Sequence, residues 1–141
     1  MAALIEAAGP YRLHPVHCDS PFEHLARAIA SQQISGAAAK SILAKFVDAF
    51  GTSGRGLRNA RLFPAPERII ATSEASLRAV GFSLAKAVAL KDLARHTLEG
   101  VVPDTRTLES LDDAAIIERL TRVRGVGPWT VQMMLMFQLG R

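Results

Sequence analysis

The sequence predicts an all-α domain, and three observations lead to that fold class. Apolar residues recur every three or four positions through most of the chain, which is the spacing of one helix face. Ser, Asp and Pro stand where these segments begin, and Gly stands where several of them end. No segment alternates apolar and polar residues over the length of a strand. The apolar pair Val101-Val102 is too short to be one. We therefore expect six or more short helices packed as one domain.

The first two helices have clear boundaries. Residues Ser20 to Glu23 read Ser-Pro-Phe-Glu, a capping box with proline at the first helical position. The helix that follows carries three apolar residues on one face: Leu25, Ala28 and Ile29. Ser35 begins the second helix and Gly51 ends it. Its apolar residues stand at helical spacing: Ile42, Leu43, Phe46, Val47 and Phe50.

Residues 51–64 form a polar, glycine-containing stretch that we expect to be a loop. Further helices follow it, and a loop containing Pro103 is expected among them. In chain order we expect a short helix from Pro66 with Ile69 and Ile70, a segment Leu77–Val80 leading into Gly81, a longer helix from Ser83 through Leu98 closed by Gly100, a helix Ala114–Arg122 after Asp112, and a final helix Trp129–Leu139.

The stretch Leu120–Thr130, LTRVRGVGPWT, is the most informative part of the chain. It reads as the end of one helix, a tight turn on Gly125-Val126-Gly127, and a new helix from Pro128. Such a turn presents backbone amides at the positive end of a helix, where anions and above all phosphate bind. This is the pattern of the helix-hairpin-helix element that binds the DNA backbone.

The alternative for this stretch is a tight connection between two helices and nothing more. Arg122, Arg124 and the Thr130 hydroxyl lie beside the turn and favour the anion-binding interpretation. The loop at residues 51–64 contains three arginines with two open interpretations: Arg55, Arg58 and Arg61. They belong either to a solvated connection or to a DNA-facing surface.

Composition limits the class of protein. The chain has 141 residues, 49% of them apolar, which suits one folded domain, and a net charge of +4 that fits a polyanionic partner without requiring one. The single cysteine, Cys18, allows no disulfide within the chain and no four-thiolate iron–sulfur cluster. No signal peptide or membrane-length apolar run is present, so we expect a soluble intracellular protein, cytoplasmic or nuclear. The four histidines lack zinc-ligand spacing: His14, His17, His24 and His96.

Three segments in order resemble one family. They are PFEHLARAIASQQIS (21–35), FPAPERIIATSEASLRAVGFSLAKAVALKDLA (63–94) and LTRVRGVGPWTVQMMLMFQLGR (120–141). Together they resemble the helix-hairpin-helix DNA glycosylases, in the DNA-3-methyladenine glycosylase II branch. The resemblance implies an enzyme that flips alkylated purines out of double-stranded DNA and hydrolyses the N-glycosidic bond. The predicted fold is then a glycosylase-type helical domain over residues 1–141, with the hairpin at 120–130.

The resemblance also implies roles for single residues. Gly125, Val126 and Gly127 would present backbone amides to a DNA phosphate, with Thr130 beside them. Gln33, with Gln32 adjacent, matches the position that fills the gap left by the flipped base. From composition alone, two glutamines at a helix end are usually solvated or capping groups.

Trp129 and Met133 match positions that line the base pocket. An indole face attracts the positive charge of an alkylated purine. Core packing is the alternative for both residues. The family's bifunctional members carry a lysine at the position of Trp129, and tryptophan cannot form a Schiff base, so a monofunctional enzyme is expected.

The resemblance further implies a Na⁺ or K⁺ ion bound by the backbone carbonyls of Thr121, Val123 and Val126. Ordinary hydration of a helix C-terminus is the alternative. No other cofactor is expected, and the complete protein is expected to be a monomer.

One element of the family pattern is missing. The family uses an aspartate after the hairpin's second helix, and no acidic residue follows Glu118 in this sequence. Asp112 and Asp113 are explained by helix capping. We expect the catalytic aspartate and the closing helices after Arg141, so that the chain is C-terminally incomplete. Two other functions stay open: a non-catalytic helix-hairpin-helix DNA-binding module, and a helical interaction domain.

Overall fold

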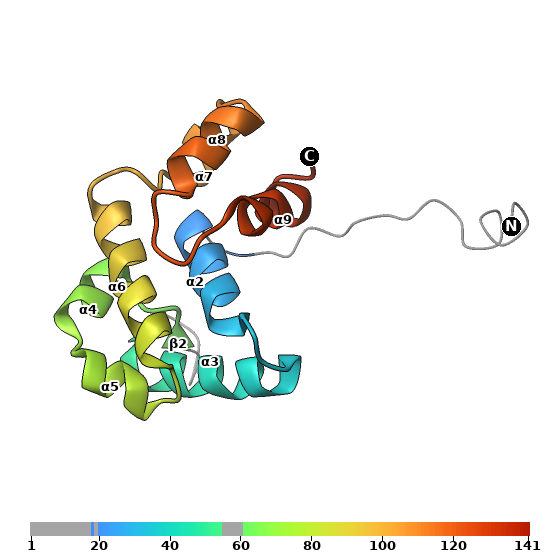
Figure 1. The fold of residues 1–141 in the computed structure, drawn as a ribbon. Coiled ribbons are helices and arrows are strands. Elements are labelled where there is room, and N and C mark those ends of the chain that lie inside the picture. Colours follow the sequence, from blue (N-terminus) through green and yellow to red (C-terminus); the bar gives the residue numbers. More distant parts are fainter. Residues whose placement is uncertain (1–17, 19, 55–60) are drawn as a thin grey trace, which may run out of the picture.

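The computed structural model describes Cys18, residues 20–54 and residues 61–141. These residues form short helices joined by tight turns, as the sequence predicts (Figure 1). In chain order the elements are α2 (Pro21–Ser31), α3 (Gly36–Phe50), β1 (Thr52–Ser53), β2 (Arg61–Leu62), α4 (Pro66–Ala71), α5 (Glu74–Ala79), α6 (Leu84–Leu98), α7 (Thr105–Glu109), α8 (Asp113–Leu120) and α9 (Pro128–Gln138).

Polar caps set the helix starts. A serine or aspartate side chain accepts a hydrogen bond from a first-turn amide in six helices, α2, α3, α5, α6, α7 and α8. At α2 the Ser20 hydroxyl accepts from the Glu23 N–H at 3.1 Å, as the predicted capping box requires, and the Glu23 carboxylate accepts from Arg27. Asp112 caps α8 as expected, accepting from the Ala115 N–H at 2.7 Å.

Two sequence predictions about the loops were wrong. The stretch 51–64 contains a two-stranded antiparallel pair, with Thr52 opposite Leu62 and Ser53 opposite Arg61. Strands of two residues are too short to show an alternating pattern. The predicted loop around Pro103 contains α7, a single turn that Asp104 caps and that buries only Leu108. Arg55 and Arg58 lie outside the described residues, and Arg61 pairs with Asp48 at 3.7 Å.

Helix α2 lies at the centre of the fold. It contacts α3 and α6 on one side and α9 on the other. Figure 1 shows the result: α3 to α6 gather at one end of the molecule and α7 to α9 at the other, with α2 between them. The turn between α8 and α9 crosses back toward α2.

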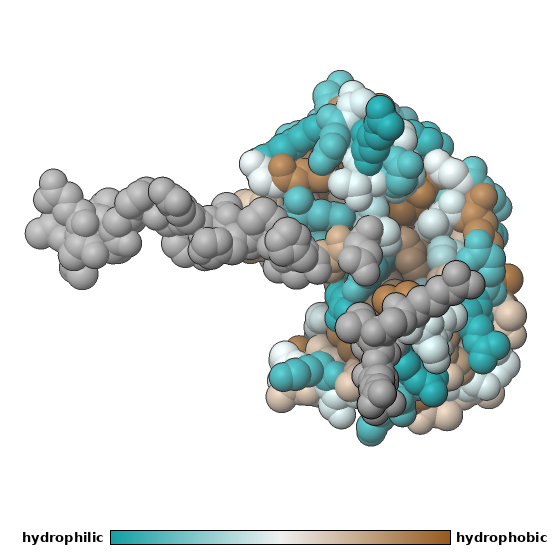
Figure 2. All heavy atoms as spheres, turned by 180° about the vertical axis from the view of Figure 1, so that it is seen from behind, coloured by the Kyte–Doolittle hydropathy of each residue, from teal (hydrophilic) through white to brown (hydrophobic). Residues whose placement is uncertain are grey.

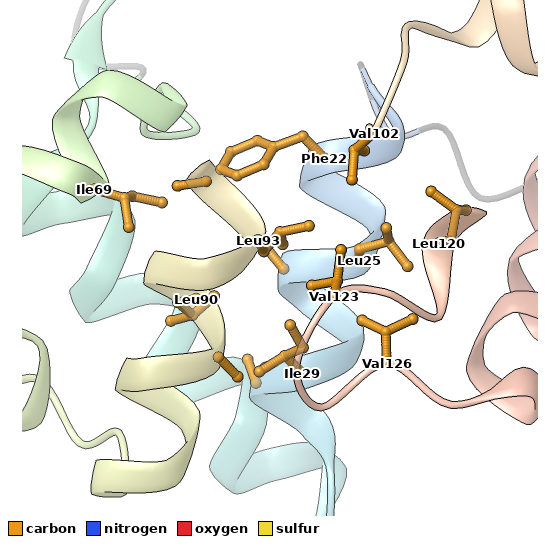
Figure 3. Close-up of a cluster of buried hydrophobic side chains, with 14 of the residues drawn as sticks. Phe22, Leu25, Ile29, Ile69, Leu90, Leu93, Val102, Leu120, Val123 and Val126 are labelled. Atoms are coloured by element: carbon orange, nitrogen blue, oxygen red, sulfur yellow. The ribbon is translucent and has the colours of Figure 1, made fainter. Parts of the chain in front are cut away.

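The core follows this arrangement. Leucine, isoleucine and valine side chains of α2, α6 and the α8–α9 turn are buried together, among them Leu25, Ile29, Leu93, Val123 and Val126 (Figure 3). A second part of the core is aromatic, since Phe46 of α3 stacks edge-on against Phe50, Phe63 and Phe82.

Figure 2 shows the molecule from behind. Hydrophilic residues are spread over its upper and lower parts, and hydrophobic residues reach the surface between them. Among the helices of the described residues, none is long and apolar enough to cross a membrane.

Two leucines of α6 provide a matched test of this packing. Leu93 is fully buried, whereas Leu98 is 49% exposed. Replacing Leu93 by alanine leaves a cavity between α6 and α2, and the free energy of unfolding should fall by about 2–5 kcal/mol. The same change at Leu98 should cost less than about 1 kcal/mol. Urea denaturation measures both, and equal losses would contradict the packing described here.

Candidate nucleic-acid interface

The turn between α8 and α9 is built around Gly125. This residue has φ +81°, in the left-handed region. A Cβ atom at Gly125 would lie 3.2 Å from the Cβ of Ala89 in α6. Backbone conformation and the close approach to α6 therefore both favour glycine at this position.

Gly127 is different, and here the sequence interpretation was wrong in part. Its φ of −94° and ψ of 170° are extended backbone that any residue adopts. A Cβ atom at Gly127 would meet nothing within 4 Å. Only Gly125 is needed for the backbone angles of the turn, and glycine at 127 keeps the space before α9 open.

The start of α9 carries unpartnered amides. Within the described part of the chain, nothing accepts a hydrogen bond from the backbone N–H groups of Gly125, Gly127, Trp129 or Thr130. Helix α4 also begins without a side-chain cap, but Glu67 lies in its first turn. The first turn of α9 has no acidic residue. This helix start therefore keeps both its N–H groups and the positive end of its dipole available for an anion.

Two buried valines hold the turn against the core. Val123 and Val126 are buried, and in Figure 3 they lie beside Leu25 and Ile29 of α2. The Val126 N–H donates to the Val123 carbonyl at 3.1 Å. Because the side chains point inward, the backbone of the glycines stays at the surface.

Asp92 of α6 contacts this turn directly. Its Oδ2 accepts from the Arg124 backbone N–H at 2.8 Å, and its Oδ1 accepts from the Arg95 side chain at 2.7 Å. Burial raises the pKa of Asp92, but the Arg124 N–H, the Arg95 hydrogen bond and the neighbouring positive charges outweigh it. The pKa therefore lies below its ordinary value of 3.8.

The turn between α2 and α3 lies next to the hairpin. The amide Nε2 of Gln32 donates to the Gly125 carbonyl at 2.8 Å. Gln33 has φ +59°, and within the described residues it is the non-glycine residue with a left-handed backbone. Its side chain is exposed. The structure thus brings both predicted glutamines beside the hairpin and gives them different surroundings.

A cavity of about 310 Å³ lies where these elements meet. Its lining comes from the α2–α3 turn, the first half of α6 and the hairpin: Ile29, Gln32, Gln33, Ser83, Ala85, Lys86, Ala89, Arg124 and Gly125. Lys86 donates from Nζ to the Ala30 carbonyl at 2.9 Å, which satisfies a free carbonyl at the end of α2.

Trp129 is a surface residue. It is 70% exposed and does not belong to the core that the described residues form. Met133, one turn later on α9, is half-buried, and the neighbouring Met134 is fully buried. Neither Trp129 nor Met133 lines the cavity beside the hairpin.

The three carbonyls predicted to hold a cation differ in their hydrogen bonds. In the described part of the chain, the Thr121 and Val126 carbonyls accept none, and the Val123 carbonyl accepts one from the Val126 N–H. All three oxygens keep a lone pair, which a Na⁺ or K⁺ ligand needs, and the cation site stays a prediction.

Two of the four histidines, His24 and His96, lie among the described residues. His14 and His17 lie outside the described residues, and among the others no group of three His, Cys, Asp or Glu side chains could hold a metal ion. Burial, and then Arg27, lower the pKa of His24. His96 is buried and donates from Nδ1 to the Asp92 carbonyl at 2.9 Å.

The roles of Asp92 and Lys86 could not have been found in the sequence. Asp92 is 32 residues from Arg124, and Lys86 is 56 residues from Ala30. No local pattern marks either contact, because both arise from the packing of α6 against α2 and the hairpin.

The two glycines of the turn should respond differently to substitution. Gly125→Ala should lower the free energy of unfolding by about 1–3 kcal/mol, since the left-handed backbone and the contact with Ala89 both disfavour a Cβ. Gly127→Ala should change it by less than about 0.5 kcal/mol. Thermal or chemical denaturation of the two variants measures both changes in the free energy of unfolding. Equal destabilisation would contradict the assignment of the turn to Gly125.

The lowered pKa of Asp92 makes a pH-dependent contribution to stability. A depressed pKa in the folded state stabilises the protein above the ordinary value near 3.8, and this contribution is lost as the pH falls through the folded pKa. The stability difference between the wild-type chain and Asp92→Asn should therefore be larger at pH 7 than at pH 3. Urea titrations at both pH values measure it, and a constant difference would contradict the contact.

The chain is similar in sequence to known DNA-3-methyladenine glycosylases. DNA-3-methyladenine glycosylase 1 of Schizosaccharomyces pombe is 37% identical over 139 residues, covering 98% of this chain and 58% of that protein. DNA-3-methyladenine glycosylase 2 of Escherichia coli is 33% identical over 113 residues, covering 80% of this chain and 39% of that protein. The chain thus spans 58% of the length of the first relative and 39% of the length of the second.

The fold is also similar to that of a solved structure. The S. pombe 3-methyladenine DNA glycosylase in complex with abasic DNA superposes with a TM-score of 0.82 at 37% identity, covering 99% of this chain and 65% of that one. The family model described as HhH-GPD superfamily base excision DNA repair protein matches residues 26–140, which include the hairpin, both glutamines and Asp92. This chain therefore belongs to the HhH-GPD superfamily of base excision DNA repair proteins.

Proposed function

We propose that this chain provides the DNA-binding and base-flipping part of a monofunctional glycosylase that removes alkylated purines of the 3-methyladenine type. The observation that carries the proposal is the cluster of unpartnered amides at the uncapped start of α9. Such a cluster suits a phosphate oxygen, and the open space before Gly127 lets the phosphate approach the backbone.

The surroundings of the hairpin support a phosphate partner. Arg122 and Arg124 are exposed on the approach to the turn, and Thr130 adds a hydroxyl in the first turn of α9. A monovalent cation at the Thr121, Val123 and Val126 carbonyls would add positive charge beside the same phosphate. The relative of known structure was solved with abasic DNA.

Gln33 is the proposed wedge. It is exposed at the tip of the α2–α3 turn, and its left-handed backbone sets it apart from its neighbours. Backbone conformations of this kind persist where the surrounding structure holds them, often at functional sites. A side chain placed here, beside a phosphate-binding hairpin, can fill the space that a flipped base leaves.

Trp129 is the proposed recognition surface for the flipped base. Its exposed indole follows the hairpin by one residue. A cation over an indole face gains about 0.5–2 kcal/mol, which favours a positively charged alkylated purine over a neutral one. Met133 lies one turn further along α9 and would complete the pocket floor.

Hydrolysis of the N-glycosidic bond needs a carboxylate near the anomeric carbon, to stabilise the oxocarbenium-like sugar and help activate water. Asp112 caps α8, and Asp113 pairs with Arg141 at 2.9 Å. Both are thereby committed to structural contacts. The proposal assigns catalysis to an aspartate that follows Arg141.

Base release tests this proposal. The full-length protein containing residues 1–141 should release 3-methyladenine from methylated double-stranded DNA over time and leave unbroken abasic sites, as measured by chromatography of free bases and denaturing gels. Trp129→Ala should slow release of the charged base by about 2–30-fold. Release of a neutral base such as hypoxanthine is the control and should slow less.

The possible outcomes separate the candidate functions. Salt-sensitive DNA binding without release by a protein that contains the downstream aspartate would favour a non-catalytic DNA-binding module. Strand cleavage accompanying release would contradict the monofunctional assignment. Absence of DNA binding would remove both functions and leave a helical interaction domain.

A further inference from the structure

Two side chains from distant parts of the chain hold adjacent residues of the hairpin. Asp92 accepts from the Arg124 N–H, and Gln32 donates to the Gly125 carbonyl, both at 2.8 Å. We propose that Asp92 and Gln32 are positioning residues that fix the phosphate-binding turn relative to the Gln33 turn. The proposal rests on the proposed DNA-binding function, since it concerns how that surface is held in place.

The turn needs such support because its own hydrogen bonds are few. Among the described residues, the segment 124–127 makes two backbone hydrogen bonds: the Val126 N–H donates to the Val123 carbonyl, and the Gly127 carbonyl accepts from the Val131 N–H. The amides aimed at the phosphate make none. A turn with a left-handed glycine and unpartnered amides costs conformational entropy to fix. Contacts from outside the turn must therefore order it before DNA binds.

Asp92 supplies the contact from α6. Gly125 packs on Ala89, and Asp92 lies three residues later, so that both contacts come from one face of this helix. Arg95 and His96 surround the carboxylate and restrict its rotation. A charge-assisted hydrogen bond from a restrained carboxylate fixes the Arg124 amide, one residue before the left-handed glycine.

Gln32 supplies the contact from the α2–α3 turn. A carbonyl oxygen can only accept, so the Gln32 amide group must face Gly125 with its nitrogen. That nitrogen is then engaged within the protein. Gln33, next in sequence, is exposed. The structure thus assigns positioning to Gln32 and leaves the DNA-facing role of this pair to Gln33.

Helix α6 contacts both turns. Lys86 of this helix donates to the Ala30 carbonyl at 2.9 Å, just before the α2–α3 turn. Lys86 holds that turn, Asp92 holds the hairpin, and Gln32 joins the two. Wedge and phosphate-binding turn are therefore fixed to the same helix and to each other. Binding of a phosphate at the hairpin then places Gln33 at a defined distance along the DNA.

Asp92 is tested with two isosteric variants. Asp92→Asn keeps an oxygen that accepts from the Arg124 N–H, whereas Asp92→Leu has no acceptor, and both remove the same charge. Affinity for a fluorescent duplex with a tetrahydrofuran abasic analogue should fall about tenfold or more for Asp92→Leu, and less than about threefold for Asp92→Asn. Hydrogen exchange of the hairpin amides without DNA should rise in Asp92→Leu alone.

Asp104 gives a matched control. Its carboxylate also accepts from a backbone amide at 2.8 Å, that of Thr107, but at the start of α7. Asp104→Leu should leave DNA affinity within about twofold of the wild-type chain. A loss of affinity equal to that of Asp92→Leu would mean that any broken cap weakens binding, and would overturn the proposal.

Gln32 is tested in a double-mutant cycle. Gln32→Met keeps the length of the side chain but removes its donor, and Gly127→Ala obstructs the approach of the phosphate. If Gln32 acts through the hairpin, the double variant should lose less affinity than the product of the fold-losses of the two single variants. A loss that multiplies fully would show that Gln32 contacts DNA by itself, which contradicts the positioning role.

The remaining outcomes are also decisive. Wild-type affinity in both Gln32→Met and Asp92→Leu, with the wild-type chain binding well, would overturn this inference and leave the proposed function intact. A wild-type chain that does not bind the duplex would overturn both. If Asp92→Leu does not fold, the cycle at Gln32 still decides.

Discussion

Burial of Val123 and Val126 is the interaction on which the rest of the site depends. These side chains are buried in the core beside Leu25 and Ile29 of α2, and so they turn the backbone of the α8–α9 connection outward. Apolar burial of this size contributes about 1.5–3 kcal/mol for each valine. That free energy holds a segment whose amides at Gly125 and Gly127 have no partner in the described part of the chain. The hydrophobic core thereby maintains a polar, unsatisfied surface for an anionic ligand.

Helix α6 links this surface to the fold. Near the start of α6, Lys86 donates to a carbonyl at the end of α2. Ala89 packs against Gly125 of the hairpin, and Asp92 accepts from the Arg124 N–H. The same helix packs on α2, α4 and α5, which makes it a rigid base. A binding surface that is ordered before its ligand arrives loses less entropy on binding. The proposed DNA binding therefore rests on preorganisation of the hairpin, with the helix dipole and the arginines as the attractive part.

Much of this could be predicted from local sequence patterns. The helical fold, the serine and aspartate caps and the hairpin follow from residues that act on their near neighbours, and the structure confirms them. The single-turn helix α7 and the pair β1–β2 were missed, because elements of two to five residues have no measurable period. Asp92 was missed for another reason: its partner is remote in sequence. Gly127 was misassigned because its backbone angles are ordinary in the folded chain. Roles for Gln33, Trp129 and Met133 stay predictions that rest on the family resemblance.

Backbone amide chemical shifts, recorded while an abasic-analogue duplex is titrated into the isotope-labelled chain, test the central claim most directly. The account predicts the largest changes at Gly125, Gly127, Trp129 and Thr130, with further changes at Gln33, and downfield movement typical of new hydrogen bonds. These changes should weaken together as salt is raised. Changes confined to another surface, for example around α4 and α5, with the hairpin amides unmoved, would contradict the account.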